Sequence, residues 1–310
     1  MDLLLKVAAD IKSLKIQGAT NVAIDGVTAF SNFVKRLDTS IGIELFETKI
    51  NEAHDILLNT RPTEPAMRNG LKKVIYDMNS VKSEGVEEME IKAIQSSNDY
   101  VKLLKSTKEK IIQAGSQRIQ DGYTVMTHCH SSTTSEIFIR AFESGKNIKA
   151  ICTETRPRYQ GRRTARELVE AGIPTTMVVD SSMRWILKKA SIDMIVIGMD
   201  AVTSQGTILN KIGSRLLSLA AKESDIPFYV AGSLLKFDSD TIFGMRTIIE
   251  MRDDTEITSD WIDAPSGLKL FNPAFESVSR DLIDALITEE GVFPPSIVHE
   301  IVRTTYPWML

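Results

Sequence analysis

Apolar residues in the first third of the chain recur at the spacing of one helix face. Every third or fourth position is apolar, as expected for amphipathic helices on a shared core, in the runs Leu4–Ile11, Val22–Val34, Ile43–Leu58, Leu71–Met78, Val86–Leu103 and Ile111–Ile119. Helix breakers fall between several of these runs, at Gln17-Gly18, at Arg61-Pro62-Thr63 and at Ser83-Glu84-Gly85. The pattern therefore predicts a helical domain over residues 1–118.

From residue 119 onward the pattern changes to short runs that are apolar throughout and alternate with amphipathic segments. The apolar runs are 123–129, 148–155, 175–182, 193–202, 227–232 and 284–291. Two intervening segments, 135–145 and 163–172, end in glycine, the residue favoured just after a helix. Strands that are apolar on both faces and alternate with helices are typical of a parallel sheet covered on both sides. We therefore predict an α/β fold in which the helical domain precedes a Rossmann-like, doubly wound, mostly parallel sheet domain over residues 119–310.

Composition and charge exclude several classes of protein. Hydrophobic residues make up 43% and charged residues 25%, which are values of a folded chain rather than a disordered one. The 37 basic and 41 acidic residues lack the basic excess of a nucleic-acid-binding protein. No run approaches the roughly 18 apolar residues of a membrane helix, and charges interrupt the N-terminal segment too often for a signal peptide. We expect neither nucleic acid nor membrane as a partner, and a cytosolic location, which the two cysteines Cys129 and Cys152 also fit.

Polar residues gather where the predicted strands end. The first run ends in His128-Cys129-His130, the second in Glu154-Thr155-Arg156, the third in Asp180-Ser181-Ser182 and the fourth in Asp200. In doubly wound sheets, ligands bind beyond the carboxyl ends of the strands. We therefore expect the functional site at this edge of the sheet.

Cys129 stands between the first predicted strand and a segment rich in helix-capping residues. A thiol at a helix N-terminus is stabilised as thiolate, so we expect a lowered pKa and a role in proton transfer. A buried structural cysteine fits the position equally well. A zinc site with His128 and His130 is disfavoured because few further ligands exist, and we expect no metal.

Asp200 follows the apolar run Met194–Met199, and apolar surroundings favour the protonated form of a carboxyl group. It is a candidate general acid, although a capping aspartate would look the same. Ser131–Thr134 form a candidate phosphate cradle at a helix start, and ordinary N-capping is the alternative. The segment 210–213 is expected to open a helix, where Lys211 could reach an anion, and Lys236 is a second such lysine.

Four arginines crowd the segment 154–165, at positions 156, 158, 162 and 163. Such density suggests bidentate contacts to an anion. A solvated surface or a salt-bridge cluster between subunits explains the same density, and we assign these arginines no catalytic role.

Six motifs in this order resemble one known family over nearly the whole chain: THCHS (127–131), ETRPRYQGRRTA (154–165), GIPTTMVVDSS (172–182), GMDAV (198–202), NKIG (210–213) and FNPAFE (271–276). The family contains the translation initiation factor 2B alpha, beta and delta subunits, methylthioribose-1-phosphate isomerase and archaeal ribose-1,5-bisphosphate isomerase. THCHS resembles the last branch, which implies Cys129 and Asp200 as the catalytic pair. The resemblance also implies substrate contacts from the loop Gln17, Gly18, Ala19 and Thr20, and from Arg61, Ser131, Ser132, Thr133, Asn210, Lys211 and Lys236.

Two positions depart from the family pattern. The N-terminal substrate loop usually reads Arg-Gly-Ala, but here Gln17 precedes Gly18 and Ala19. The third residue after the catalytic cysteine is often lysine in the isomerase, and here it is Ser132. Each change removes a positive charge from an expected phosphate site. The departures leave open a non-catalytic regulatory homologue and an isomerase with another substrate.

The resemblance implies conversion of ribose 1,5-bisphosphate to ribulose 1,5-bisphosphate in the degradation of nucleoside monophosphates. Asp200 would protonate the ring oxygen and the Cys129 thiolate would move a proton from C2 to C1. We expect no cofactor, because the hydrogen moves within one substrate. The alternatives are a regulatory subunit that binds a nucleotide or sugar phosphate, and methylthioribose-1-phosphate isomerase. Expected partners are a phosphorylated pentose, a nucleotide activator and further copies of the chain as a dimer or hexamer, because the apolar segment 291–310 would be costly to expose.

Overall fold

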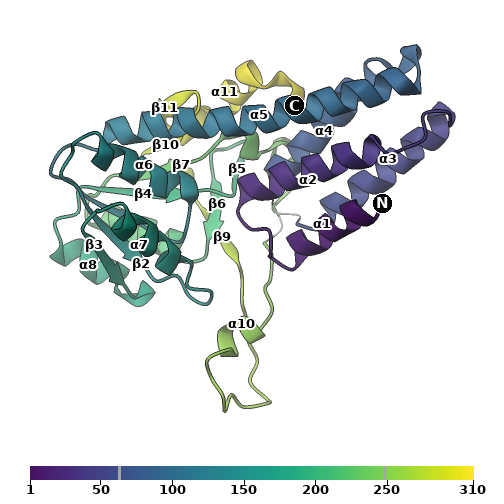
Figure 1. The fold of residues 1–310 in the computed structure, drawn as a ribbon. Helices are drawn as coiled ribbons and strands as arrows, with labels where there is room; N and C mark the ends of the chain where they lie inside the picture. Colours follow the sequence, from purple (N-terminus) through teal and green to yellow (C-terminus); the bar gives the residue numbers. More distant parts are fainter. Residues whose placement is uncertain (62–63, 248) are drawn as a thin grey trace.

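The computed structural model describes residues 1–61, 64–247 and 249–310, and its first part is helical (Figure 1). The helices are α1 (Asp2–Lys12), α2 (Ala19–Val34), α3 (Ile43–Leu58), α4 (Pro65–Asn79) and α5 (Val86–Arg118). The two predicted runs 86–103 and 111–119 therefore belong almost entirely to one helix of 33 residues. Gly85 begins it with φ +109°, a conformation that suits glycine. The predicted breaker at Pro62-Thr63 lies outside the described residues.

The large sheet has seven strands in the order β11-β10-β7-β4-β1-β2-β3. Their bounds are β1 (Thr124–Thr127), β2 (Lys149–Thr153), β3 (Thr175–Val178), β4 (Met194–Gly198), β7 (Phe228–Ala231), β10 (Ala285–Thr288) and β11 (Gly291–Phe293). All neighbouring pairs are parallel except β10 and β11. The chain starts in the middle at β1, runs outward to β3 and returns to β4 beside β1, so the strand order reverses there. This order is that of the doubly wound Rossmann fold, as predicted.

A second, smaller sheet was not predicted. Its strand order is β8-β5-β6-β9, with bounds β5 (Ala201–Thr203), β6 (Ile208–Lys211), β8 (Phe237–Asp238) and β9 (Phe275–Val278). The predicted run 193–202 therefore splits at Met199-Asp200 into strands of two different sheets. The helix predicted to open at residues 210–213 begins at Ser214 with Gly213 as its N-cap, but Asn210 and Lys211 themselves end strand β6, which was not predicted.

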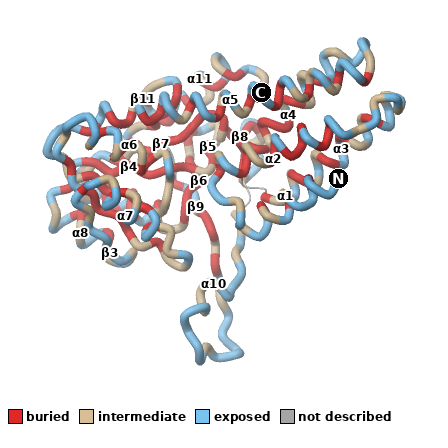
Figure 2. Tube along the Cα trace, viewed as in Figure 1, coloured by how far each residue is buried: buried red, intermediate tan, exposed pale blue. Residues whose placement is uncertain are grey.

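Helices cover both faces of the large sheet, because successive strand residues point to opposite sides. Val125 belongs to the core under the end of α5, α6 (Ser132–Glu143) and α7 (Gln160–Glu170), whereas Met126 belongs to the core under α8 (Met183–Lys189) and α9 (Ser214–Glu223). Gly145 and Gly172, both with positive φ, follow α6 and α7 as expected for helix ends. Figure 2 shows these buried strands in red beneath exposed outer helix faces.

An arm, described over residues 244–247 and 249–274, projects from the body between the helices and the sheet (Figure 1). It carries a short helix, α10 (Thr255–Thr258), and exposes large apolar side chains at Met245, Trp261, Ile262, Leu268 and Phe271.

The C-terminal segment 291–310 packs against the chain's own core, contrary to our expectation that it would form an interface between copies of the chain. Val302 of α11 (Val298–Thr305) and the nearby Met309 are buried in the chain's own core. The exposed apolar surface that would favour assembly therefore lies on the arm instead.

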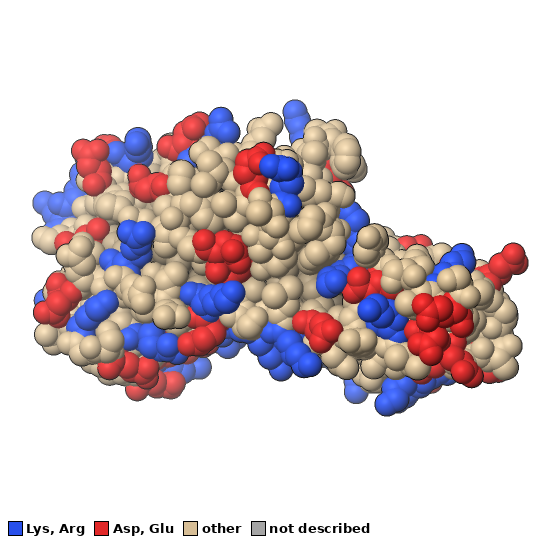
Figure 3. Space-filling view, turned by 90° about the horizontal axis from the view of Figure 1, so that it is seen from above, with Lys and Arg blue, Asp and Glu red and all other residues tan. Residues whose placement is uncertain are grey.

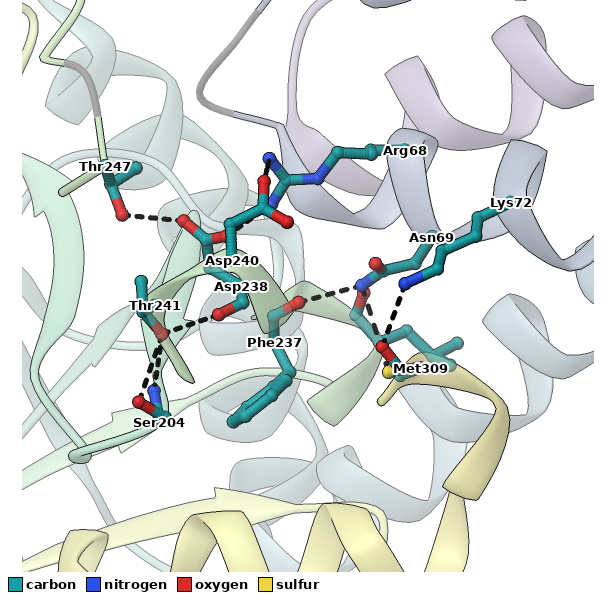
Figure 4. Close-up of polar contacts among 11 residues, drawn as sticks. Arg68, Asn69, Lys72, Ser204, Phe237, Asp238, Asp240, Thr241, Thr247 and Met309 are labelled. Atoms are coloured by element: carbon teal, nitrogen blue, oxygen red, sulfur yellow. Dashed lines mark hydrogen bonds and ion pairs between the residues drawn. The ribbon is translucent and has the colours of Figure 1, made fainter. Parts of the chain in front are cut away.

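A polar seam fastens α4 to the segment around β8 (Figure 4). The buried Asn69 donates from Nδ2 to the carbonyl oxygens of Leu235 and Phe237, at 2.9 and 2.8 Å. Arg68 forms ion pairs with Asp238 and Asp240. Asn69 thus holds the backbone on both sides of Lys236, at the end of the short 3-10 helix η3 (Leu234–Lys236).

Charged side chains of both signs lie next to one another on the face seen in Figure 3. This mixture leaves that face without the broad basic surface that is typical of nucleic-acid-binding proteins. Within the described residues, no helix combines the length and the apolar character needed to cross a membrane.

Candidate active site

A pocket of about 190 Å³ opens where β1 and β4 lie side by side, at the point where the strand order reverses. Ligands of doubly wound sheets bind at this kind of point. The pocket brings together thirteen site residues named from the sequence, namely Gln17, Gly18, Ala19, Thr20, Arg61, Cys129, Ser131, Ser132, Thr133, Asp200, Asn210, Lys211 and Lys236. Thr134 of the predicted cradle is buried in α6 and does not line it. The thirteen residues come from α2, α6, η3, β6, the turns before α2 and α4, and the loops after β1 and β4. Their placement is therefore a product of the tertiary fold.

A glycine allows the loops after β1 and β4 to approach each other. A Cβ atom on Gly198, the last residue of β4, would lie only 2.8 Å from the Cβ of Ser131. Any larger residue would push the loop that carries Cys129 away from the loop that carries Asp200. Cys129 itself adopts φ +68°, and threonines hold it on both sides. Its N–H donates to Thr155 Oγ1 at 3.0 Å, and its carbonyl accepts from Thr164 Oγ1 at 2.9 Å.

The prediction of a lowered pKa for Cys129 was wrong. Burial of the thiol raises its pKa to about 11, and the carboxylates of Asp200 and Asp180 act in the same direction. Lys211 and the backbone N–H of His130 oppose them but do not compensate for the loss of water. Although the residue is partly exposed at the pocket, the thiol carries its proton at neutral pH in the ligand-free protein.

The two histidines beside Cys129 have structural partners. His128 is buried, with Nδ1 at 2.6 Å from Thr153 Oγ1 and Nε2 at 2.8 Å from the carbonyl of Ile212. His130 Nδ1 lies 3.1 Å from Thr164 Oγ1. Burial lowers the pKa of both rings. Among the residues that the structure describes, no cluster of three or more His, Cys, Asp or Glu side chains could hold a metal ion.

The arginines of the segment 154–165 form ion pairs within the chain. Arg156 pairs with Asp260 and Arg158 with Glu256, both at 2.8 Å, which ties the segment to the arm. The other two pair with acidic residues near their own helix, Arg162 with Glu154 and Arg163 with Glu167. Of the three explanations considered, the salt-bridge cluster fits best, but it forms inside one chain.

Two lysines bring positive charge to the pocket without a carboxylate partner in the described part of the chain. Lys211 Nζ lies 4.9 Å from the centroid of the Phe275 ring, and Lys236 Nζ donates to the carbonyl of Met199 at 2.7 Å. Lys211 lowers the pKa of the Cys129 thiol, and Lys236 lowers the pKa of the Glu64 carboxyl group.

Two helix N-termini also line the pocket, that of α2 with Gly18–Asn21 and that of α6 with Ser131–Thr133. The first N–H groups of a helix have no helical partner, so a helix N-terminus attracts anions. Gly18 has no capping side chain, and Ser131 Oγ accepts only from the N–H of Thr134. Gln17, in the loop before α2, donates from Nε2 to the carbonyl of Leu14 at 2.6 Å. The pocket thus offers two helix N-termini and two lysines as groups that attract anions.

Comparison with known proteins agrees with this arrangement. The sequence matches the Initiation factor 2 subunit family over residues 15–295, which is most of the chain. The chain belongs to this family. The ribose 1,5-bisphosphate isomerase of Archaeoglobus fulgidus is 37% identical over 302 residues, which cover 97% of this chain and 93% of the relative. The methylthioribose-1-phosphate isomerase of Thermosipho melanesiensis is 36% identical over 311 residues, which cover 94% and 86%.

Solved structures of the initiation factor 2 subunit family share the fold. The crystal structure of the Pyrococcus horikoshii OT3 translation initiation factor eIF-2B superposes with a TM-score of 0.79 at 27% identity, covering 94% of this chain and 97% of that one. The predicted family and fold are confirmed. The names of the relatives confirm the expectation of an isomerase. The substrates in those names are the substrates of the relatives.

Sequence reasoning missed two ionisable residues that line the pocket of this initiation factor 2 subunit family member, Glu64 and Arg252. Glu64 is buried, lines the pocket and pairs with Arg61 at 3.0 Å. Arg61, which the resemblance assigned to substrate, is itself buried and also pairs with Glu250 at 3.2 Å. Glu64 precedes Pro65 at the start of α4, where a glutamate looks like an ordinary helix-capping residue. Nothing in the local sequence marks it as a pocket residue.

Proposed function

We propose that this chain is an aldose–ketose isomerase that converts ribose 1,5-bisphosphate to ribulose 1,5-bisphosphate. The observation that carries the proposal is the pair of anion sites in one pocket. Two helix N-termini, those of α2 and α6, and two lysines, Lys211 and Lys236, line this pocket, which suits a ligand that bears a phosphate at each end. The relatives named ribose 1,5-bisphosphate isomerase support the same substrate.

Cys129 and Asp200 supply the proton transfers in this proposal. Asp200 gives a proton to the ring oxygen as the C1–O bond opens. The Cys129 thiolate removes the proton from C2, which leaves an enol between C1 and C2, and returns it to C1. The 2-hydroxyl proton leaves to the Asp200 carboxylate as the ketone forms, so both groups end in their starting states. Transfers by positioned groups contribute on the order of 10²- to 10⁴-fold to the rate.

The raised pKa of Cys129 fits this scheme because the pair can share one proton. Before the reaction the thiol holds it. Transfer from the thiol to Asp200 produces the base and the acid together, without a change in the total number of bound protons. Lys211 favours the thiolate at this stage.

A second candidate substrate is methylthioribose 1-phosphate. Leu14, Ala19 and Met199 add apolar surface to the pocket, which suits a methylthio group, and one relative carries that name. A single phosphate would leave one of the two anion sites unused.

The deciding experiment is a coupled assay of the purified protein with α-ribose 1,5-bisphosphate and, in parallel, with methylthioribose 1-phosphate. We expect turnover of the bisphosphate at a kcat/KM well above that for the other substrate. Asp200→Asn keeps the shape of the side chain but removes its transferable proton, so it should bind substrate without isomerising it. Ligand binding without turnover by the unmodified protein would instead indicate a regulatory subunit.

A further inference from the structure

The second carboxylate oxygen of Glu64 is buried without a partner. Glu64 is 2% exposed and lines the pocket beside Asp200 and Lys236. Oε1 pairs with Arg61 Nη1 at 3.0 Å, whereas Oε2 finds no hydrogen-bond partner among the described residues. A buried polar atom left unpaired costs about 1–3 kcal/mol. An orphaned oxygen on the wall of a ligand pocket therefore indicates a contact that a ligand completes.

Groups from four parts of the chain act on this carboxyl. Burial raises its pKa to about 7. The negative charges of Asp200 after β4 and Glu250 of the arm also raise it. The positive charges of Arg61 in its own turn and Lys236 of η3 lower it. Burial therefore favours the protonated form of Glu64 far more than in an ordinary, solvated glutamate. In its protonated form the side chain can donate and accept a hydrogen bond at the same time.

We propose that Glu64 is a substrate-recognition residue that binds a hydroxyl group of the sugar through Oε2, in its protonated form. This inference rests on the proposed function. It names the side chain that recognises the sugar itself, between the two phosphates. A carboxylate at this position would add a negative charge against two phosphates. The neutral acid avoids that repulsion and still satisfies both the hydroxyl and the orphaned oxygen.

Binding should be measured by calorimetry in a Cys129→Ser background, so that the substrate is not consumed. The ligands are ribose 1,5-bisphosphate and pentane-1,5-diyl bisphosphate, which has the same phosphates but no hydroxyl groups. We expect Glu64→Ala to weaken binding of the ribose ligand by about 10- to 100-fold. Binding of the pentane ligand should change by less than about threefold, because it never made the contact.

Glu250→Ala is the matched control, because it also removes a carboxylate from Arg61 but does not line the pocket. Measured at pH 6, where Glu64 stays mostly protonated even if the loss of Glu250 lowers its pKa, this variant should leave the preference for the ribose ligand unchanged. Equal losses for both ligands in Glu64→Ala, or the same ribose-specific loss in Glu250→Ala, would overturn the proposal. Circular dichroism and melting curves of each variant identify any that do not fold. For such a case Glu64→Gln, which keeps the shape, provides the second test.

The pH dependence provides that test. With Glu64 present, the dissociation constant for ribose 1,5-bisphosphate should rise by at least about tenfold from pH 6 to pH 8.5, beyond the change for the pentane ligand. Glu64→Gln should bind as tightly as the parent at pH 6 and lose this rise, because its amide donates at every pH. Identical pH profiles of parent and Glu64→Gln would overturn the proposal. These outcomes concern binding alone, whereas failure of the proposed function would appear as absent turnover with Cys129 intact.

Discussion

At the scale of single residues, Cys129 shows that the surroundings in a pocket can reverse the pKa shift expected from the neighbouring sequence. The helix start at Ser131 predicts a thiolate, but burial and two nearby carboxylates favour the thiol. Lys211 is the one side chain among the main influences that favours the thiolate. We therefore infer that the reactive thiolate forms only when its proton can move to another group in the pocket.

The first prediction concerns Cys129→Ser. Serine is nearly isosteric but far less acidic, so the fold should persist while kcat falls by at least about 10²-fold. Cys152→Ala is the control, because Cys152 lies buried in β2 and does not line the pocket. It should keep kcat within about threefold. Parental kcat in Cys129→Ser would remove the thiol from the mechanism.

The second prediction concerns the pH dependence of kcat. If Cys129 and Asp200 share one proton, the resting and reactive forms carry equal numbers of protons. Because the pKa of the thiol is about 11, kcat should then vary by less than about threefold between pH 7 and pH 9. A mechanism that needs only a free thiolate would raise kcat about tenfold per pH unit instead. Steady-state kinetics at saturating substrate distinguish the two.

The third prediction concerns Gln17, which replaces a family arginine beside the α2 N-terminus. Gln17→Arg should tighten bisphosphate binding by about one to two orders of magnitude, because a charge-assisted hydrogen bond contributes about 1.5–3 kcal/mol. Gln17→Met, which loses the bond to Leu14 without adding a charge, serves as the control. Unchanged affinity in Gln17→Arg, measured by calorimetry, would show that this loop does not touch a phosphate.

At this scale the sequence indicated which residues line the site, but it did not indicate the pKa values of their side chains. Motif resemblance placed thirteen residues correctly around one pocket, although their roles stay predictions. The pKa of Cys129 was predicted with the wrong sign because its burial and the nearby carboxylates depend on segments distant in sequence, such as those that carry Asp180 and Asp200. Glu64 was missed for the same reason, since its burial comes from packing that its neighbours in sequence do not reveal.

At the scale of elements, the large sheet was predictable because its strands are apolar on both faces. Strands such as β4, Met194–Gly198, are buried along their whole length, so they appear as uninterrupted apolar runs. The small sheet gave no such signal, because β5 and β8 have only three and two residues. The run 193–202 crosses from one sheet to the other at Asp200. Hydrophobicity alone does not reveal this change of direction.

The fourth prediction belongs to the seam between α4 and η3. Asn69→Ala removes the donor to the carbonyls of Leu235 and Phe237, so the free energy of unfolding should fall by about 2–4 kcal/mol. KM for the bisphosphate should rise as well, because Lys236 lies between the two freed carbonyls. Asn79→Ala, at the exposed end of the same helix, should change neither. Urea denaturation and steady-state kinetics check both effects; a stable variant with parental KM would contradict this role of the seam.

At the scale of the whole molecule, ion pairs attach the arm to the walls of the pocket. Arg61 pairs with Glu250 and Arg158 with Glu256, so both sides of the pocket reach the same projecting segment. Apolar side chains on the arm stay exposed, Ile262 and Phe271 among them. Apolar patches of this kind are usually covered by a partner surface.

The fifth prediction is that copies of this chain assemble through the arm. Light scattering at micromolar concentration should give the mass of a dimer or hexamer. Ile262→Asp together with Phe271→Asp places charges on the tip of the arm and should shift the mass toward the monomer. Charges at two other exposed positions, Tyr76→Asp and Ile91→Asp, are the control and should leave the mass unchanged. A monomeric mass for the unmodified protein would contradict the prediction.

The long helix α5 has a practical consequence for anyone who wishes to dissect this protein. Its first half, with Tyr100 and Leu104, packs in the core of the helical part, whereas Ile111 and Ile112 pack in the core of the sheet part. Near its end Gly115 lies so close to α6 that a Cβ atom there would come within 2.6 Å of Ile137. A truncated protein that begins after residue 118 would lack the end of α5 that covers one face of the large sheet. A shortened version intended for expression should begin upstream of residue 105 and keep the second half of α5.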